Sequence, residues 1–423
     1  MQTSLQGISN KAKRDRQHRF LNLYTMLDET NLLDTWRFLN REAASGIDGV
    51  SARTYEQDLA GNLNRLVERL KRGGYRARLV RRQYIPKGDG KERPLGIPVI
   101  EDKLLQTAAS RILTAIYEPE FSNRSYGYRP ERSVHDAVKS VTDTLQFGHY
   151  GYVVEADIEK FFDQIDHDWL LKMLTHRIRD RAFVGLIRKW LKAGILERDG
   201  SVLHPERGTP QGGSVSPVLA NIYLHYVLDL WFEKVVRKQC RGKAWLCRYA
   251  DDFICAFQYQ GDAEWFYTAL ATRLGKFGLR LSAAKTRIVP FSGHRIAEKR
   301  RFDFLGFEFR WGYSQKGEPL LKRRTSRKKF RQSLANFTAW CRANRWLPLR
   351  LLNMQLNRKL RGYYNHYGII GNYASLEEFR YRVRQILFKW LNRCSHRRRY
   401  SWAGFLDMEK EYPIIRPTIT RRI

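Results

Sequence analysis

The chain has 423 residues, which is too long for one small hydrophobic core, so we expect two or three subdomains. Its 77 Lys and Arg against 43 Asp and Glu give a net charge of +34, which opposes compaction unless a polyanion neutralises it. No apolar run approaches the roughly 20 residues of a membrane-spanning helix, so nucleic acid is the favoured polyanion and an anionic membrane surface is the alternative.

The cysteines and the N-terminus bear on the compartment. The five cysteines form no Cys-x-x-Cys pair, which argues against a structural zinc site and favours reduced thiols in a cytosol-like compartment. The first 20 residues lack the apolar segment of a secretory signal. They are Arg-rich and acid-poor, which leaves an organellar address open, although a basic segment that contacts RNA is the simpler interpretation. We therefore expect a cytoplasmic, bacterial protein.

The first 75 residues are expected to be helical. Apolar residues recur at helical spacing over 20–27 and again over 59–70, before Gly73-Gly74 ends the pattern. A strand at 77–85, a turn at 86–90 and a return strand at 93–98 then predict a β-hairpin.

The middle of the chain predicts a helix over 101–117, followed by a strand, 151–156, that ends at Asp157. Ser216-Pro217 is typical of a helix start, with Ser as the N-cap and Pro in the first helical position. Two short apolar strands, 245–248 and 253–257, predict a second hairpin with adjacent acids at its tip.

The last quarter is basic and helical. From residue 321 onward, 25 Lys and Arg stand against five Asp and Glu, so this part carries +20 of the total charge. An amphipathic helix is expected over 330–341, and at least two more near 349–366 and 376–393. Strands in the middle and helices at both ends predict an α+β fold.

The acids at the second hairpin carry the main chemical hypothesis. Asp251 and Asp252 would repel each other as ordinary neighbours, and Asp is disfavoured in strands, so a divalent cation would explain the pair. Asp157 would converge on the same point if its strand lies beside the hairpin. Three carboxylates could then hold two Mg²⁺ for phosphoryl transfer. The alternative is an ordinary turn, in which Asp caps its own backbone.

Seven blocks, in order, resemble the group II intron reverse transcriptases. They are IPKGDGKERPLGIP (85–98), FSNRSYGYRPERSVHDAV (121–138), VVEADIEKFFDQIDHDWL (153–170), RGTPQGGSVSPVLANIYLHYVLD (207–229), CRYADDFICAF (247–257), LSAAKT (281–286) and FDFLGFEF (302–309). In addition, GIDGV (46–50) resembles the N-terminal extension of that family, and LNRKLRGYYNHYG (356–368) its maturase or thumb region.

This resemblance implies a right-hand polymerase. A helical N-terminal extension would span 1–75, fingers and a palm with an antiparallel sheet 76–315, and a basic helical thumb or maturase domain 316–423. The enzyme would copy an RNA or DNA template from a DNA primer with dNTPs, and would bind group II intron RNA to assist splicing and retrohoming. Many relatives continue into a His-Asn-His endonuclease; this chain shows no such block, so we expect it to resemble the endonuclease-lacking bacterial members and to leave second-strand cleavage to others.

The resemblance also implies the roles of individual residues. Asp157 and Asp251 would be the principal metal ligands, Asp252 would lie nearer the primer end, and the carbonyl of Ile158 would complete one shell. The metal would be Mg²⁺, two ions, with Mn²⁺ as an alternative. The implied nucleotide-binding residues are Lys87, Arg93, Phe161, Gln211 and Lys285.

Each nucleotide-binding residue has an expected task and an ordinary alternative. Lys87 and Arg93 would clamp the triphosphate, or form a solvated basic turn. Phe161 would exclude a 2′-hydroxyl, or be a core residue, as Phe162 is expected to be. Gln211 would lie in a glycine loop beside the nascent base pair. Lys285 would lie near the leaving phosphate, or simply on the surface.

Other polar residues favour structural roles: we interpret Ser214, Ser216, Asp163, Asp166 and Asp168 as capping or solvated groups. In the C-terminal helices the predicted nucleic-acid contacts are Arg323, Arg324, Lys328, Lys329, Arg358, Arg361, Tyr363, Arg397 and Arg398, with the arginine clusters at 322–329 and 397–399 placed in turns. Aromatic residues among these cations, Trp340, Trp346, Tyr364, Tyr367 and Trp390, could stack on unpaired bases. His366 is interpreted as an RNA contact or a packing residue.

Two alternatives stay open beside the intron-encoded enzyme. A free-standing relative recruited for host DNA repair or defence would have the same catalytic residues. An RNA-binding splicing factor with an idle polymerase site is disfavoured, because the three acids, Lys87, Arg93 and Gln211 are all present. The oligomeric state is not indicated by the sequence.

Overall fold

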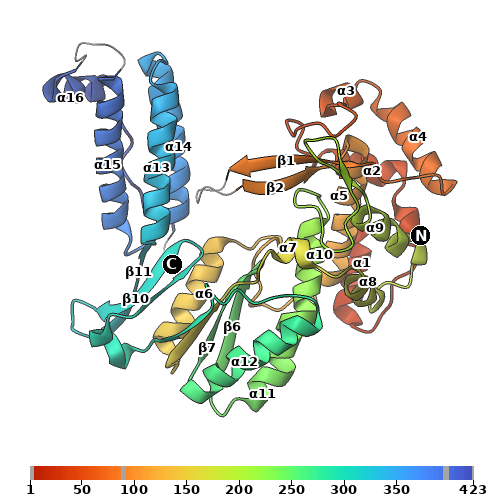
Figure 1. Cartoon of the computed structure of the whole chain (residues 1–423), viewed down its shortest axis with the longest axis horizontal. Coiled ribbons are helices and arrows are strands. Elements are labelled where there is room, and N and C mark those ends of the chain that lie inside the picture. Colours follow the sequence, from red (N-terminus) through yellow and green to blue (C-terminus); the bar gives the residue numbers. More distant parts are fainter. Residues whose placement is uncertain (1–3, 87–91, 394–399, 422–423) are drawn as a thin grey trace. The chain divides into compact units, whose positions relative to one another are not determined.

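The computed structural model describes residues 4–86, 92–393 and 400–421, and its chain forms two compact units of mixed helix and strand (Figure 1). Unit 1 comprises 1–133 and 156–287, and unit 2 comprises 134–155 and 288–423. The predicted mixture of helices and antiparallel strands is present. The predicted three-way division of the sequence stays a prediction.

The N-terminal part of unit 1 is helical, as expected, except at 20–27. Its helices are α1 (Leu5–Arg14), α2 (Glu29–Trp36), α3 (Ala52–Glu56) and α4 (Leu59–Lys71). The expected helix at 20–27 is wrong. There the Phe20 amide donates to the carbonyl of Arg177 and the Phe20 carbonyl accepts from Arg179, and only one 3₁₀ turn, Tyr24–Met26, follows. Phe20, Leu23 and Leu27 are buried, but the backbone at Phe20 forms its hydrogen bonds with a distant segment instead of within a helix.

A long buried helix and a small sheet follow in unit 1. Helix α5 (Ile100–Tyr117) is apolar on nearly every face and packs against α1 and α2. The predicted first hairpin is confirmed as β1 (Val80–Pro86) and β2 (Glu92–Ile97), paired antiparallel. Two short strands, β4 (Ile195–Leu196) and β5 (Val202–Leu203), extend it in the order β2-β1-β4-β5. The tip of the hairpin lies outside the described residues.

The rest of unit 1 contains the second predicted hairpin and further helices. That hairpin is confirmed as β6 (Ala244–Tyr249) and β7 (Asp252–Phe257). The helical elements are α7 (Phe161–Gln164), α8 (His167–Thr175), α9 (Arg181–Leu191), α10 (Ser216–Leu224), the π-helical turns His225–Asp229 and Phe232–Val236, α11 (Arg237–Gln239) and α12 (Gln260–Lys276).

Two predicted caps have different outcomes. Asp166 caps α8, because its carboxylate accepts a hydrogen bond from the Trp169 amide at 3.0 Å. Ser216 does not cap α10, which is a correction: the preceding residue, Val215, is the N-cap and has no side-chain acceptor. The Ser216 hydroxyl instead donates to the carbonyl of Pro210 at 2.9 Å and ties the preceding loop to the helix.

Unit 2 combines a meander with a helical bundle. Its strands are β3 (Tyr152–Ala156), which delivers Asp157 as predicted, β8 (Arg287–Pro290), β9 (Arg301–Phe304), β10 (Phe307–Tyr313) and β11 (Pro319–Thr325). Strand β10 pairs antiparallel with both β9 and β11. Its helices are α6 (Val134–Phe147), α13 (Arg327–Asn344), α14 (Leu349–Tyr367), α15 (Tyr373–Leu391) and α16 (Trp402–Glu411).

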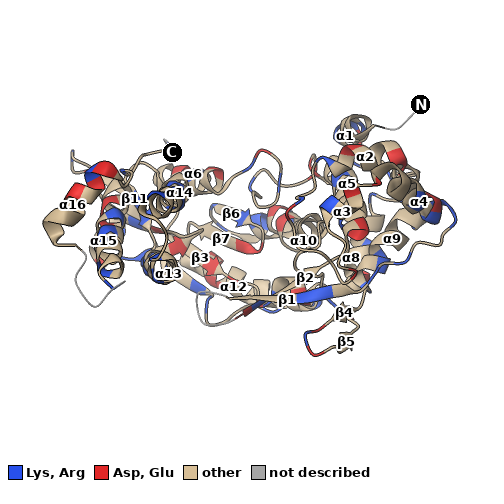
Figure 2. Ribbon diagram, turned by 90° about the horizontal axis from the view of Figure 1, so that it is seen from above, with Lys and Arg blue, Asp and Glu red and all other residues tan. Residues whose placement is uncertain are grey.

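The C-terminal helices α13, α14 and α15 lie side by side (Figure 1), and each buries a stripe of apolar residues spaced three or four apart. Figure 2 shows Lys and Arg distributed over these helices. One expectation is corrected: residues 322–325 are not a turn but the end of β11, because Arg323 and Arg324 pair with β10 residues in register.

Two broader expectations concern membranes and thiols. Every helix in the described part of the chain is too short or too polar to span a lipid bilayer. The described cysteines 240, 247, 255 and 341 are free thiols, as predicted, and burial raises the pKa of Cys240 to about 11. Cys394 lies outside the described residues.

Candidate active site

The tip of the β6–β7 hairpin is a two-residue turn made by Ala250 and Asp251. Tyr249 and Asp252 are the last paired residues on either side of it. Ala250 has a φ of +57°, a left-handed conformation that a residue with a Cβ adopts at a cost of about 1–2 kcal/mol. A turn under this strain needs support from its surroundings.

The support is a buried ion pair directly behind the turn. Arg248 and Asp229 are 0% and 1% exposed, and the guanidinium donates to both carboxylate oxygens at 2.7 and 2.5 Å. The remaining guanidinium nitrogen donates to the Asn221 side chain at 2.9 Å and to the carbonyl of Ala250 at 3.0 Å. Asn221 in turn donates to the carbonyl of Gly127 at 2.8 Å. The strained turn is therefore held through its own backbone.

Gly127 closes the same turn from another side. A Cβ on this glycine would lie 2.3 Å from the Ala250 nitrogen, so no larger residue fits. Sequence reasoning missed Gly127, Arg248 and Asp229. The available signal was a lone charge inside each of two otherwise apolar runs, LHYVLDLWF and WLCRYA, because a charged residue is rarely buried unless it is paired.

Asp157 follows β3 and is fixed by the segment that carries Lys285. The Asp157 carbonyl accepts from the Ser282 amide at 2.8 Å, and Ile158, which is 3% exposed, bridges to Leu281. The Asp157 carboxylate accepts from the Lys285 ammonium at 2.7 Å. This hydrogen bond raises the pKa of Lys285, to which the charges of Asp252 and Asp251 add. Lys285 therefore lies beside the acids.

The charge of one principal predicted ligand, Asp157, acts on the other, Asp251. Burial raises the pKa of Asp251, the charge of Asp157 raises it further, and the charges of Arg93 and Arg248 oppose this. Asp157 and Asp251 are 94 positions apart in sequence, yet within unit 1 they act on each other electrostatically. The predicted convergence of an acid-ending strand on the acidic hairpin is thus supported by their interaction.

The described residues hold no ready-made metal cage. Among the residues that the structure describes, no group of three or more His, Cys, Asp and Glu side chains is arranged to hold a metal ion. One oxygen of Asp157 is taken by Lys285. Carboxylates and a backbone carbonyl are nevertheless the donors that hard divalent cations prefer. The oxygen donors therefore fit such a cation, provided that the Lys285 ammonium moves away from the Asp157 carboxylate.

The basic and aromatic residues around the acids come from the first hairpin and from the segment before α6. Arg93 lies exposed on β2 and is paired with Ile85 of β1. Its positive charge acts to lower the pKa of both Asp251 and Tyr128. Burial raises the pKa of Tyr128, and the charge of Asp251 raises it further. Tyr128 has a φ of +56° and was not singled out from the sequence. Lys87 lies outside the described residues.

The two phenylalanines after Asp157 differ in exposure. Phe161 is 2% exposed, with its ring 5.4 Å from that of Phe162 and 6.5 Å from that of Tyr223. Phe162, which was expected to be core, is only half-buried and packs edge-on against Tyr128. The role of Phe161 at the sugar stays a prediction, and Phe162 becomes a competitor for it.

The glycine loop lies against strand β2. The Gly96 amide donates to the carbonyl of Gln211 at 2.6 Å. Gly212 has a φ of +118°, and a Cβ there would lie 2.5 Å from the Gly96 carbonyl oxygen. The close backbone approach seen here is made to Gly96 of the protein itself. An approach of this loop to the nascent base pair stays a prediction.

In unit 2, the predicted nucleic-acid residues fall into two groups. Lys328, Lys329, Arg358 and Arg361 are exposed on α13 and α14. Others are engaged within the protein. Arg324 donates to the buried Glu308 at 2.8 Å and Arg323 to Thr142 at 3.2 Å. Arg397 and Arg398 lie outside the described residues.

The aromatic residues of this region divide in the same way. Tyr364 and Tyr367 are buried, so they pack inside the protein and do not offer a ring for stacking on unpaired bases. Tyr363 stacks on Phe379 at 3.8 Å between ring centroids, and His366 stacks on Phe307. Trp346 is 64% exposed and borders a groove of about 720 Å³ that Trp390 also lines. Trp346 is therefore exposed, and the Arg345 guanidinium lies over its ring, 4.9 Å from the centroid.

Comparisons with known proteins identify the family of this chain. Residues 85–309 match the family described as "Reverse transcriptase (RNA-dependent DNA polymerase)". Protein YkfC of Escherichia coli strain K12 is 34% identical over 60% of this chain and 76% of its own length. Group II intron-encoded protein LtrA of Lactococcus lactis subsp. cremoris is 30% identical over 89% of this chain and 75% of its own length. An uncharacterized 91 kDa protein in the cob intron of Schizosaccharomyces pombe is 29% identical over 87% of this chain and 54% of its own. The acidic hairpin lies inside the matched region, and the chain belongs to the reverse transcriptase family of RNA-dependent DNA polymerases.

Proposed function

We propose that this reverse transcriptase is encoded by a group II intron, and that Asp157, Asp251 and Asp252 form its polymerase centre. The observation that carries the proposal is the strained turn of Asp251, held by the buried Arg248–Asp229 pair, with the charge of Asp157 raising the pKa of Asp251. A protein gains no stability from crowding acids in this way, so the arrangement favours a functional purpose. The intron origin is supported by the similarity to LtrA over most of both chains.

The proposed cofactor is a pair of Mg²⁺ ions, with Mn²⁺ as an alternative. The three aspartates and the carbonyl of Ile158 would hold them. When bound, such ions lower the pKa of an attacking hydroxyl and offset the charge on the transferring phosphoryl group. The carboxylates would fix the positions of these ions. The hydrogen bonds of Arg248 hold the turn that carries Asp251 in its strained conformation.

Lys285 would act on both sides of the reaction cycle. Without nucleotide, its ammonium neutralises Asp157 at 2.7 Å. Its side chain is 66% exposed, so it would be free to move aside if a cation bound Asp157, and its ammonium would then be available to the leaving pyrophosphate. Arg93 and Lys87 would hold the triphosphate of the incoming dNTP from the β1–β2 hairpin.

In the right-hand description that we propose, β1–β2 belongs to the fingers, β6–β7 to the palm and α13–α15 to the thumb. The thumb helices would hold the duplex of RNA template and DNA primer and would bind the intron RNA to assist splicing. The exposed cations of α13 and α14, together with the +20 charge of the last quarter, support this.

Primer extension on an RNA template tests the polymerase centre. The full chain with Mg²⁺ should make cDNA, and Asp251→Asn should reduce the rate by a factor of 1,000 or more, as expected when about 4 kcal/mol of transition-state stabilisation is lost. Asp168→Asn, which removes the same charge from an exposed position on α8, is the matched control and should stay active. If the unaltered chain binds RNA but makes no cDNA, the idle-site splicing factor is the better description.

A second comparison separates the two phenylalanines. If Phe161 excludes the 2′-hydroxyl, Phe161→Ala should admit ribonucleotides, and Phe162→Ala should keep the preference for dNTPs. The measurement is the ratio of kcat/KM for a dNTP and the corresponding ribonucleotide. Relaxed selectivity in Phe162→Ala alone would move the assignment to Phe162, as its greater exposure suggests.

A further inference from the structure

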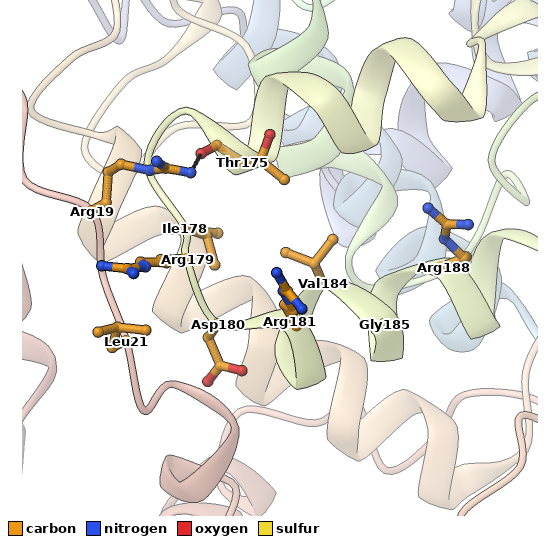
Figure 3. A pocket seen from close by; sticks show the side chains of 10 residues that line it. All are labelled: Arg19, Leu21, Thr175, Ile178, Arg179, Asp180, Arg181, Val184, Gly185 and Arg188. Atoms are coloured by element: carbon orange, nitrogen blue, oxygen red, sulfur yellow. Dashed lines mark hydrogen bonds between the residues drawn. The ribbon is translucent and has the colours of Figure 1, made fainter.

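A basic pocket of about 680 Å³ opens in unit 1 where the segment after α1 meets the start of α9 (Figure 3). Four arginines line it: Arg19, Arg179, Arg181 and Arg188. All four are exposed. In Figures 1 and 2 the elements around this pocket, α1, α8 and α9, lie apart from the β6–β7 hairpin within the same unit. The pocket is therefore separate from the candidate active site.

Three of these arginines form no ion pair with any residue that the structure describes. Arg19 donates to the carbonyl of Thr175 at 3.0 Å, but within the described chain Arg179, Arg181 and Arg188 have no carboxylate partner. The one acid in the pocket, Asp180, is committed elsewhere. Its two oxygens accept from the amides of Tyr24, at 2.8 Å, and Phe183, at 3.0 Å.

The backbone leaves room among these charges. Arg181 and Arg188 are seven positions apart and so lie on one face of α9, with Gly185 between them on that face. A Cβ on Gly185 would meet nothing within 4 Å, so the helix surface there is open. Three unpaired guanidinium forks around open space match the geometry of phosphate oxygens, which arginine binds in bidentate fashion.

We propose that this pocket binds backbone phosphates of RNA. The bound segment is a different one from the template segment that lies in the polymerase active site. The proposal rests on the proposed function for its choice of polymer, because an enzyme that copies RNA meets a polyanion longer than its active site. Repeated phosphates would engage several arginines at once, whereas a free anion would engage one or two. The pocket thus serves as a second anchor that holds RNA while the template moves.

The test compares two triple variants of the full chain that lose the same charge. Arg179→Ala/Arg181→Ala/Arg188→Ala empties the pocket of its unpaired guanidinium groups and leaves the Arg19 contact intact. Lys71→Ala/Lys238→Ala/Lys276→Ala removes three exposed cations of unit 1 that do not line it. Binding of a labelled oligouridine RNA is measured across a salt series, together with the melting temperature of each variant.

The pocket variant should show a shallower salt dependence, because each phosphate contact in a single strand contributes about 0.7 to the slope of log affinity against log salt. Loss of three contacts lowers the slope by about 2, so between 50 and 200 mM salt the affinity of the unaltered chain should fall about 20-fold more than that of the variant. The lysine variant should keep the larger part of the original slope. Both should melt as the unaltered chain does.

Three outcomes decide the question. Equal slopes for the pocket variant and the unaltered chain, or an equal loss in the lysine variant, would overturn the proposal. Inorganic phosphate or pyrophosphate that raises the melting temperature only when the arginines are present, with RNA affinity unchanged in the pocket variant, would make this a small-anion site and also overturn the proposal.

Extension of a saturating short primer–template is the separate readout of the polymerase. If the unaltered chain makes no cDNA while the pocket variant still loses RNA affinity, the proposed function fails and the pocket stands.

Discussion

The acidic turn of unit 1 and the basic helices of unit 2 use charge in opposite ways. At the turn, a few carboxylates lie close together and depend on a fully buried guanidinium for their position. On α13 and α14 the cations Lys328, Arg358 and Arg361 are exposed, and many others surround them. A centre of the first kind fails when one group is removed, whereas a surface of the second kind weakens by steps. The predictions below test this difference.

The largest expected effect is on the buried support. Arg248→Met leaves Asp229 as an unpaired buried charge, so the free energy of unfolding should fall by about 3–5 kcal/mol. Urea unfolding of the metal-free protein measures it. Arg248→Met/Asp229→Leu removes both charges and should be less destabilised than the single variant. A single variant as stable as the unaltered chain would show that the turn does not depend on this pair.

The next effect concerns an aromatic residue of the basic helices. Tyr363 stacks on Phe379, so Tyr363→Ala should lower the free energy of unfolding by about 3 kcal/mol, the usual cost of losing a packed ring. Tyr363→Phe keeps the ring and should bind RNA as the unaltered chain does. If Tyr363→Phe instead lowers RNA affinity at unchanged stability, the hydroxyl contacts RNA and belongs to the surface.

A smaller effect is expected from the exposed cations themselves. Arg358→Ala/Arg361→Ala should lower the slope of log RNA affinity against log salt by about 1.4, the sum of two phosphate contacts. Stability should change by no more than about 0.5 kcal/mol, because both side chains are on the surface. Filter binding over a salt series provides the slope. An unchanged slope would remove this face of α14 from the proposed RNA surface.

The smallest expected effect is an increase in the free energy of unfolding, produced by replacing Asp251. The pKa of Asp251 is raised above 3.8, chiefly by burial, so the folded chain binds a proton at pH values where the unfolded chain has lost it. Stability of the metal-free protein therefore falls as pH rises through that window. Asp251→Asn cannot ionise at this position, so it should be the more stable protein at neutral pH although its polymerase rate should be far lower. Thermal melts at pH 4 and pH 7 measure this, and a less stable variant at pH 7 would contradict the assigned direction.

The sequence predicted the local parts of the site well because their signals are local. The hairpin over 245–257 and the strand that ends at Asp157 both follow from neighbouring residues. The helix predicted over 20–27 was wrong because apolar spacing indicates which residues are buried. It does not indicate which residues form the backbone hydrogen bonds. Ser216 misled because a competing acceptor, the Pro210 carbonyl, was invisible in the sequence.

What the sequence determined by itself is the inventory: three acids at strand ends, a family pattern in order along the chain, and an excess of positive charge. The tertiary structure decided which charges meet. Lys285 and Asp157 are 128 positions apart, Arg248 and Asp229 are 19 apart, and the arginine pocket joins residue 19 to residues 179–188. Electrostatic and hydrogen-bond energies depend on distance in space, which periodicity along a chain does not encode. For that reason the acids could be named from the sequence, but the pair that holds them and the pocket that lies apart from them could not.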